Sequence, residues 1–216
     1  DAVRVLLGTI ATRAAQLDRA IEPILALFDG HHVRVSVLVR KSKQGADKTR
    51  ELMGWRVRTE GEPYAFVQHP SPEEMKRSSG PMWIGPIWNQ EVCSRLTEDY
   101  AVETCLAKKN DIERGEALGL EWSDADHLYA EREIRRSVRH IADAAPLLSG
   151  DHLLLAFDQI PRLANVGSLP TMERLIEALN AAGHPTARAP DLRPFIATRA
   201  PFNAVIELVQ SLQSTE

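Results

Sequence analysis

The sequence predicts an α/β unit followed by a mainly helical α+β domain. Residues 1–69 show helical periodicity first and then a strand, a helix and two further strands, an order typical of the end of an α/β sheet. Prolines then become frequent, and most of the remaining chain has the apolar spacing of helices. These observations place the boundary between the two parts near residues 69–80.

The first part begins with a long apolar periodicity. Apolar residues recur at helical spacing over residues 3–28, and Pro23 disfavours a helical conformation at Glu22. We therefore expect two helices, or one sharply kinked helix, in this stretch. Alternating valines over residues 33–39 predict a strand with one deeply buried face. The next elements are expected to be a helix near 45–53 and strands near 54–60 and 63–68.

The second part is marked by helix-capping residues. Asn89 is placed to cap a helix from 90 to about 100, and residues 123–126 resemble a capping box that opens a helix ending near 145. Residues 151–216 predict a winged-helix-like tail. Its elements are expected to be a short helix near 157–164, a helix that starts after Ser168 and stops at Gly183, a wing over 184–190 and 194–199, and a closing helix from Phe202.

Residues 80–88 read Gly-Pro-Met-Trp-Ile-Gly-Pro-Ile-Trp. Proline removes backbone donors and fixes φ, so this segment is expected to be neither a regular helix nor a central strand. Trp83 and Trp88 have two interpretations, as core side chains at the junction of the two parts or as platforms for an unpaired base. Packing is the favoured interpretation.

This segment resembles the Gly-Pro-Leu-Trp-x-Gly-x-Leu segment of tRNA guanine-N2 dimethyltransferases. Three more segments follow the family's order. Residues 3–28 are similar to its GLRILLGxIARTAARYDxxIEPLLS helix, and residues 31–54 to its HYFRVYVxVxRGAxxADExLxxLG strand and helix. Residues 171–201 are similar to its PLxxVIEALRxAGYRASRTHFxPTGIKTDAP segment. The resemblance therefore runs over most of the chain.

The resemblance implies a function and a domain plan. Members of this family methylate N2 of guanosine 26 in tRNA and use S-adenosylmethionine as the methyl donor. Residues 1–69 are then expected to be the C-terminal end of a Rossmann-like, class I methyltransferase sheet, and residues 70–216 a tRNA-binding domain. The expected partner is tRNA, and the expected location is the cytoplasm, or the nucleus as well in a eukaryote.

Motifs for the cofactor and for catalysis are not found in this sequence. It has no G-x-G-x-x-G loop and no Asp-Pro-Phe-Gly-like segment, and in the family these motifs precede the GLRILLG helix. We therefore name no catalytic or cofactor-binding residue, and expect a fragment that is inactive alone and whose S-adenosylmethionine is bound by an upstream half. Cys93 and Cys105 are expected to be reduced, partly buried thiols. They lack the paired spacing that suggests zinc in some relatives, so no metal is predicted.

Three groups of cations are candidates for tRNA contact, although the chain has a net charge of −4. Residues 34–58 hold eight cations and two anions, which attract phosphate, and their strand arginines are expected to share one sheet face. Arginines over 132–139 lie on one helix stripe, where salt bridges are the plainer explanation. Arg188 falls on the arginine of the family's S-R-T-H segment. The predicted RNA-binding residues are Arg34, Arg40, Lys41, Lys43, Arg56, Arg58, Arg132, Arg136, Arg188 and Arg193.

Two other interpretations of the sequence stay open. Residues 151–216 alone are compatible with a non-enzymatic winged-helix module that binds DNA. Against it, the start of the candidate recognition helix offers a single cation, Arg174. The other interpretation is a protein–protein scaffold whose basic strand face is only solvated. A comparison of binding to tRNA and to duplex DNA separates the methyltransferase from the DNA-binding module. Reversing the charges of Arg40, Lys41 and Lys43 and measuring tRNA affinity separates the methyltransferase from the scaffold.

Overall fold

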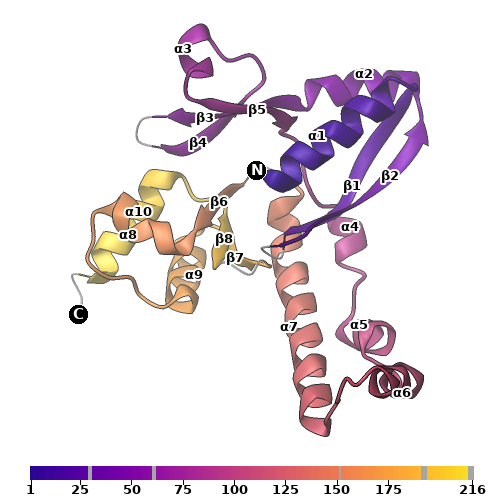
Figure 1. Ribbon diagram of the computed structural model, residues 1–216. Helices are drawn as coiled ribbons and strands as arrows, with labels where there is room; N and C mark the ends of the chain where they lie inside the picture. The colour runs from indigo at the N-terminus through magenta and orange to yellow at the C-terminus, as the bar shows by residue number, and fades with distance from the viewer. Residues whose placement is uncertain (29–30, 60–61, 151, 191–193, 214–216) are drawn as a thin grey trace.

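The computed structural model describes residues 1–28, 31–59, 62–150, 152–190 and 194–213. Figure 1 shows an N-terminal group of elements and a C-terminal tail that meet beside the N-terminus, with the long helix α7 running away from the junction. The N-terminal group contains α1 (Ala2–Ala15), β1 (Arg19–Phe28), β2 (Val33–Lys41), α2 (Lys43–Glu51), β3 (Met53–Thr59), β4 (Glu62–Val67), α3 (Pro72–Met75) and β5 (Ser78–Trp83).

Four helices follow this group and lead into the tail. They are α4 (Gln90–Cys93), α5 (Glu98–Cys105), α6 (Lys109–Ala117) and α7 (Asp124–Leu148). The tail contains β6 (Leu153–Ala156), η1 (Phe157–Gln159), α8 (Ile160–Ala164), α9 (Met172–Ala181), β7 (Thr186–Ala189), β8 (Phe195–Thr198) and α10 (Phe202–Gln213).

The first sheet is the antiparallel pair β1–β2, and it corrects a prediction. Two helices, or one kinked helix, were expected over residues 3–28, but the helix ends at Ala15 and residues 19–28 form β1. The register shifts between Pro23 and Leu25, and such an irregularity accommodates a proline, which has no N–H for the ladder. Long-range pairing with β2 therefore outweighs the helical spacing of this segment. The alternate valines of β2 are half-buried at most, so its inner face is less buried than expected.

The second sheet has the order β4-β3-β5 and is antiparallel. The helix predicted near 45–53 and the strands near 54–60 and 63–68 are confirmed as α2, β3 and β4. β5 contains Pro81 and is an edge strand, as the sequence required. α1 packs against β5 at Gly8, where a Cβ atom would lie 3.1 Å from the Trp83 backbone nitrogen. The β3–β5 pairing crosses the boundary expected near 69–80.

Both tryptophans of the Gly-Pro segment are core residues. Trp83 and Trp88 are buried among side chains of α1, β1 and the end of α7. The indole N–H of Trp83 donates to the Pro86 carbonyl at 2.7 Å, and that of Trp88 donates to the Ala26 carbonyl at 2.8 Å. The packing interpretation is confirmed, because a buried indole is stable when its N–H has an acceptor.

The predicted caps are present, although one helix is shorter than expected. The side chain of Asn89 accepts from the Val92 N–H at 3.0 Å, but α4 ends at Cys93 instead of continuing to 100. Thr97 starts the separate helix α5 by accepting from the Tyr100 N–H, so a second cap interrupts the expected helix. The box at Ser123 is confirmed as the start of α7.

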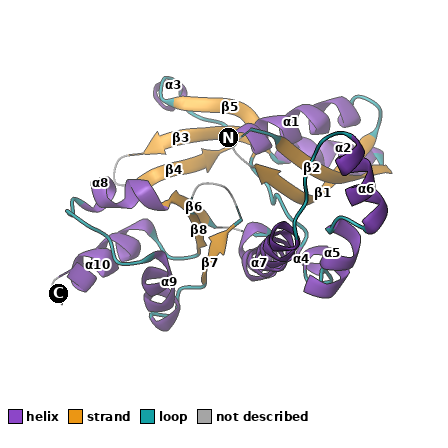
Figure 2. Ribbon diagram, turned by 60° about the horizontal axis from the view of Figure 1, so that its bottom comes forward, coloured by secondary structure: helices purple, strands orange, loops and turns teal. Residues whose placement is uncertain are grey.

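The tail folds around its own apolar core. Its sheet has the antiparallel order β6-β8-β7, and η1, α8, α9 and α10 occupy the positions that the sequence predicted for helices. Leu155, Leu175, Ile196 and Val205 are buried in this core. A buried hydrogen bond of 2.7 Å joins the hydroxyls of Thr186 and Thr198 across the sheet. Figure 2 shows the tail sheet facing the β3–β4 hairpin.

Candidate functional site: an aromatic cavity and three groups of cations

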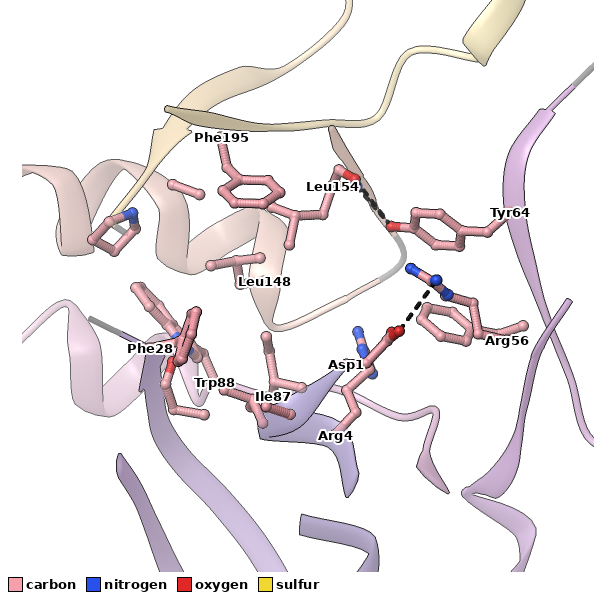
Figure 3. A pocket seen from close by; sticks show the side chains of 16 residues that line it. Asp1, Arg4, Phe28, Arg56, Tyr64, Ile87, Trp88, Leu148, Leu154 and Phe195 are labelled. Atoms are coloured by element: carbon pink, nitrogen blue, oxygen red, sulfur yellow. Dashed lines mark hydrogen bonds and ion pairs between the residues drawn. The ribbon is translucent and has the colours of Figure 1, made fainter. Parts of the chain in front are cut away.

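A cavity of about 290 Å³ lies where the N-terminal group meets the tail. The start of α1, the end of β1, the β3–β4 hairpin, the Trp88 segment, the end of α7 and the tail sheet all contribute to its wall. Figure 3 shows Phe28 and Trp88 on one side, Arg56 and Tyr64 on the other, and Phe195 above them. Segments that are distant in the sequence thus form one site, which we call the junction cavity.

Five aromatic side chains line the junction cavity: Phe28, Tyr64, Phe66, Trp88 and Phe195. Tyr64 and Phe66 are two residues apart on β4 and therefore project from the same face, with ring centroids 5.3 Å apart. The polar atom of Trp88 is already bonded to a carbonyl. The wall is consequently rich in flat apolar surface, which suits stacking with a planar ligand.

Arg4 brings a guanidinium group to the cavity from the first turn of α1. Its Nη1 donates to the carbonyls of Trp83 at 3.1 Å and Gly85 at 2.9 Å. Its guanidinium carbon lies 4.4 Å from the ring centroid of Phe66, a cation–π contact. Burial lowers the pKa of Arg4 to about 10, and the nearby Tyr64 hydroxyl opposes this shift. Arg4 therefore stays charged at neutral pH in a partly desolvated position.

Arg56 and Tyr64 form the opposite corner of the cavity. Arg56 lies 3.1 Å from the Asp1 carboxylate, and its guanidinium carbon lies 5.6 Å from the Tyr64 ring centroid. The Tyr64 hydroxyl accepts from the Leu154 N–H at 2.9 Å and lies 3.4 Å from the Leu154 carbonyl oxygen. Burial raises the pKa of Tyr64. The hydrogen bond between Tyr64 and Leu154 ties the β3–β4 hairpin to β6 of the tail.

The structure divides the first predicted group of cations between two sheets. Arg34 and Arg40 lie on the exposed face of β2, Lys41 is the last residue of that strand, and Lys43 is the first residue of α2. Arg56 and Arg58 lie on β3, in the other sheet. The expectation that the strand arginines share one sheet face is therefore wrong, because the chain turns through α2 into a separate sheet.

Two predicted arginines on α7 lie on its solvent side. Arg132 and Arg136 are exposed, and Arg136 forms an ion pair with Glu133. Their neighbours Arg135 and Arg139 instead bond to α5, through Asp99 at 2.8 Å and Glu98 at 3.2 Å respectively. Salt bridges thus account for much of the arginine stripe, and Arg132 and Arg136 remain the members best placed for an external partner.

The third predicted group lies in the tail. Arg188 on β7 is 3.8 Å from Glu173 of α9, an ion pair within the tail. Arg193 lies outside the described residues. Arg199 donates to the Pro146 carbonyl at 3.0 Å, near the end of α7. Arg188 therefore makes a contact within the tail, and Arg199 makes one that joins the tail to α7.

Comparison with known proteins identifies the family. The family model described as N2,N2-dimethylguanosine tRNA methyltransferase matches residues 1–210. The chain belongs to this family. The tRNA (guanine(26)-N(2))-dimethyltransferase of Thermoplasma acidophilum is 26% identical over 210 residues, which are 97% of this chain and 46% of that protein. The enzyme of the same name from Thermoplasma volcanium is 33% identical over 111 residues, which are 50% of this chain and 30% of that protein.

A solved structure supports the fold of this family member. Trm1 from Pyrococcus horikoshii, in complex with S-adenosyl-L-methionine, superimposes with a TM-score of 0.67 at 22% sequence identity. The likeness covers 96% of this chain and 48% of that one. The α/β fold with small sheets is therefore shown. Nearly all of this chain aligns with these relatives, but it spans only about half of their length.

Sequence reasoning singled out Arg56 and Trp88 but missed Arg4, Tyr64 and Phe66 of the junction cavity. Arg4 lies in the segment similar to GLRILLG, yet nothing in the spacing indicates that it meets Gly85. Tyr64 and Phe66 offered a weak indication, because two aromatics on one face of a strand form a flat surface. Within the described ranges, no cluster of three or more His, Cys, Asp or Glu residues could hold a metal ion, and no helix has the length and apolarity to cross a membrane.

Proposed function

We propose that residues 1–216 form the C-terminal half of a tRNA guanine-N2 methyltransferase that acts on guanosine 26. The observation that carries this proposal is the family match over residues 1–210, in a chain that covers about half of its relatives. S-adenosylmethionine supplies an electrophilic methyl group in this reaction. The junction cavity does not suit its sulfonium, because at its wall the cations Arg4 and Arg56 outnumber the Asp1 carboxylate. We therefore place the cofactor outside these residues and assign no catalytic residue.

In this proposal residues 1–69 complete the methyltransferase sheet. Among the described residues, β2 pairs with β1 and with no other strand. Leu38 and Val39 of β2 are 40% and 44% exposed, although both are apolar. A strand edge with free backbone groups and exposed apolar side chains is a template for a further strand. The occupant that we propose is a strand from the half of the enzyme that carries the cofactor motifs.

Residues 70–216 act as the tRNA-binding part, with residues 151–216 as a winged-helix-like unit. Support comes from the exposed Arg132 and Arg136 on α7. We also place Arg188 among the tRNA contacts; its side chain is 40% exposed beside Glu173. Arg34, Arg40, Lys41 and Lys43 of the N-terminal group add an exposed basic edge. Cations of this kind bind the phosphate backbone and position the RNA, which is recognised largely by shape.

A methyl-transfer assay tests the proposal for the reaction. Residues 1–216 are expected to transfer no labelled methyl group from S-adenosylmethionine to unmodified tRNA. A longer chain that includes the upstream coding sequence is expected to methylate N2 of guanosine 26. Turnover by residues 1–216 alone would contradict the division of labour, and a longer chain without activity on tRNA would contradict the function.

Charge reversal tests the proposal for tRNA binding. Changing Arg40, Lys41 and Lys43 to glutamate is expected to weaken tRNA binding. The plot of log affinity against log salt concentration is expected to become less steep, its slope shrinking in magnitude by about 2–3. The matched control changes Lys108, Lys109 and Arg114 to glutamate, which alters net charge equally at exposed positions on and beside α6. Equal effects of the two triple variants would show that the basic edge of β2 has no specific role.

A further inference from the structure

Apolar side chains gather at the end of α7 that is remote from the junction cavity. Leu118, Leu120 and Trp122 lie between α6 and α7, and Leu128 and Tyr129 lie in the first two turns of α7. Their exposed fractions are, in that order, 80%, 64%, 40%, 67% and 66%. We call these five residues the tip patch. The end of α7 lines the junction cavity, and its start lies about 36 Å away along the helix axis (Figure 1).

The tip patch is large for a surface that faces only water. A large aromatic side chain presents about 150–250 Å² and a leucine somewhat less, so the exposed parts of the five residues present on the order of 500 Å². The largest apolar patch of an ordinary monomer measures roughly 300–600 Å² and often has a function. The size of the tip patch therefore indicates a surface that another molecule covers.

Helix α6 lacks the packing that usually stabilises a short helix. None of its nine residues, all of which the structure describes, is buried. An isolated helix shorter than about 12–15 residues is marginal in water, and packing of an apolar face normally stabilises it. The N–H of Leu120 donates to the Gly115 carbonyl at 2.9 Å, which folds the tip patch back onto the end of α6. A partner that covers Leu118 and Leu120 therefore also holds α6 in place.

The charge around the tip patch decides the class of partner. Residues 111–131 contain seven acidic residues and one basic residue, Arg114. A field of this sign repels RNA phosphates and an anionic membrane surface. It also disfavours a second copy of this chain, because a two-fold contact sets the same acidic surface against itself. The complementary surface is apolar with a basic rim.

We propose that the tip patch docks a basic amphipathic helix of another protein. Apolar side chains of that helix at i, i+3, i+4 and i+7 form one stripe and cover the tip patch. Lysines and arginines beside the stripe meet the acidic rim, where Glu116, Glu121 and Asp124 are exposed. The inference goes beyond the proposed function and does not depend on the methyl-transfer reaction.

A synthetic peptide is the probe for this docking site. It has about 18 residues, or five helical turns, with leucine along the stripe and lysine elsewhere. One control peptide replaces lysine by glutamate, and the other scrambles the order so that the stripe is lost. Fluorescence anisotropy is expected to show that residues 1–216 bind the basic amphipathic peptide at least about tenfold more tightly than either control. Amide hydrogen exchange is expected to slow in α6 and to stay unchanged in α9.

Leucine variants locate the peptide on the protein. Leu128→Ser is expected to weaken binding about tenfold, because an apolar contact at the centre of the interface is lost. Leu17→Ser is the matched control, since Leu17 follows α1, is 70% exposed and lies outside the tip patch. It is expected to keep the affinity of the parent chain.

Charge variants test the acidic rim. Glu116→Lys combined with Glu121→Lys is expected to weaken peptide binding about tenfold, because both carboxylates become cations beside the lysines of the peptide. Glu177→Lys combined with Glu207→Lys makes the same change in net charge at exposed positions of α9 and α10. This second pair is expected to keep most of the affinity.

Five results would overturn the inference. Equal affinity for the basic and the charge-inverted peptide would remove the charge argument, and equal affinity of Leu128→Ser and Leu17→Ser would place the peptide elsewhere. A dimer of residues 1–216 that Leu128→Ser converts to a monomer in sedimentation would assign the tip patch to a second copy. A longer chain, with the upstream coding sequence, that does not bind the peptide would assign it to the upstream half. A tenfold loss of tRNA affinity in Leu128→Ser would assign it to RNA. Each result leaves the methyltransferase proposal standing, because methyl transfer to tRNA tests that proposal separately.

Discussion

Removing the Tyr64 hydroxyl is expected to loosen the contact between the two parts of the chain. That hydroxyl accepts from the Leu154 N–H at 2.9 Å, across a cavity wall that joins β4 to β6. Tyr64→Phe keeps the ring and leaves the Leu154 N–H without this acceptor. A neutral hydrogen bond lost at a half-buried site costs about 1–2 kcal/mol of unfolding free energy. For a chain of this length, this loss corresponds to a fall in Tm of roughly 3–6 °C.

The pH dependence sharpens this prediction. Burial raises the pKa of Tyr64 in the folded protein, against the weaker opposing effects of the Leu154 bond and the charges of Arg4 and Arg56. Between the ordinary tyrosine pKa near 10 and the raised folded value, the unfolded chain releases a proton that the folded chain keeps. The stability contributed by the neutral hydroxyl is therefore complete below about pH 10 and is lost as the pH rises above it.

Urea unfolding at about pH 7 and about pH 10.5 measures both effects. The parent chain is expected to exceed Tyr64→Phe in unfolding free energy at neutral pH, and the difference is expected to shrink at the alkaline pH. Tyr129→Phe is the control, because the Tyr129 side chain on α7 is exposed. A Tyr64→Phe midpoint equal to that of the parent at neutral pH, or a difference that does not change with pH, would refute the assigned role of the hydroxyl.

Three further predictions concern the tail, the thiols and α7. Thr198→Val is expected to cost about 2 kcal/mol in urea unfolding, because the buried Ala200 N–H loses its acceptor at 3.0 Å; an unchanged midpoint would contradict this. A thiol reagent is expected to label the exposed Cys105 in the native protein and Cys93 only after denaturation, since Cys93 is buried and burial raises its pKa. A mass spectrum of the native protein that shows two labels per chain would contradict this. Arg135→Met is expected to speed amide hydrogen exchange in α5 but not in α9, because Arg135 joins α5 to α7; equal exchange in α5 would exclude that link.

Local interactions were the part of the structure that the sequence predicted well. The caps at Asn89 and Ser123 each bond to a backbone N–H three residues away, so the required residues are visible in one short window. The strands and helices of the tail follow from apolar spacing and from Gly183 in the same way. Packing of Trp83 and Trp88 was also predicted, because a proline-rich segment with two large aromatics has few stable places except a core.

The errors arose where distant segments compete with local preference. Residues 19–28 have helical spacing, but pairing with β2 and the irregularity after Pro23 make them a strand. The arginines of β2 and β3 lie close in sequence, yet strand pairing assigns them to different sheets. Neither outcome is encoded in a window of a few residues, because each depends on which strand is available as a partner.

The sequence by itself determined the family, the helix starts and most of the secondary structure of this protein, because motifs and caps act over a few neighbouring residues. Only the tertiary structure decided the junction cavity. Arg4 reaches the Gly85 carbonyl across 81 residues, and Tyr64 reaches Leu154 across 90. The physical reason is that burial and hydrogen bonding in the folded chain, not proximity in the sequence, bring these groups together.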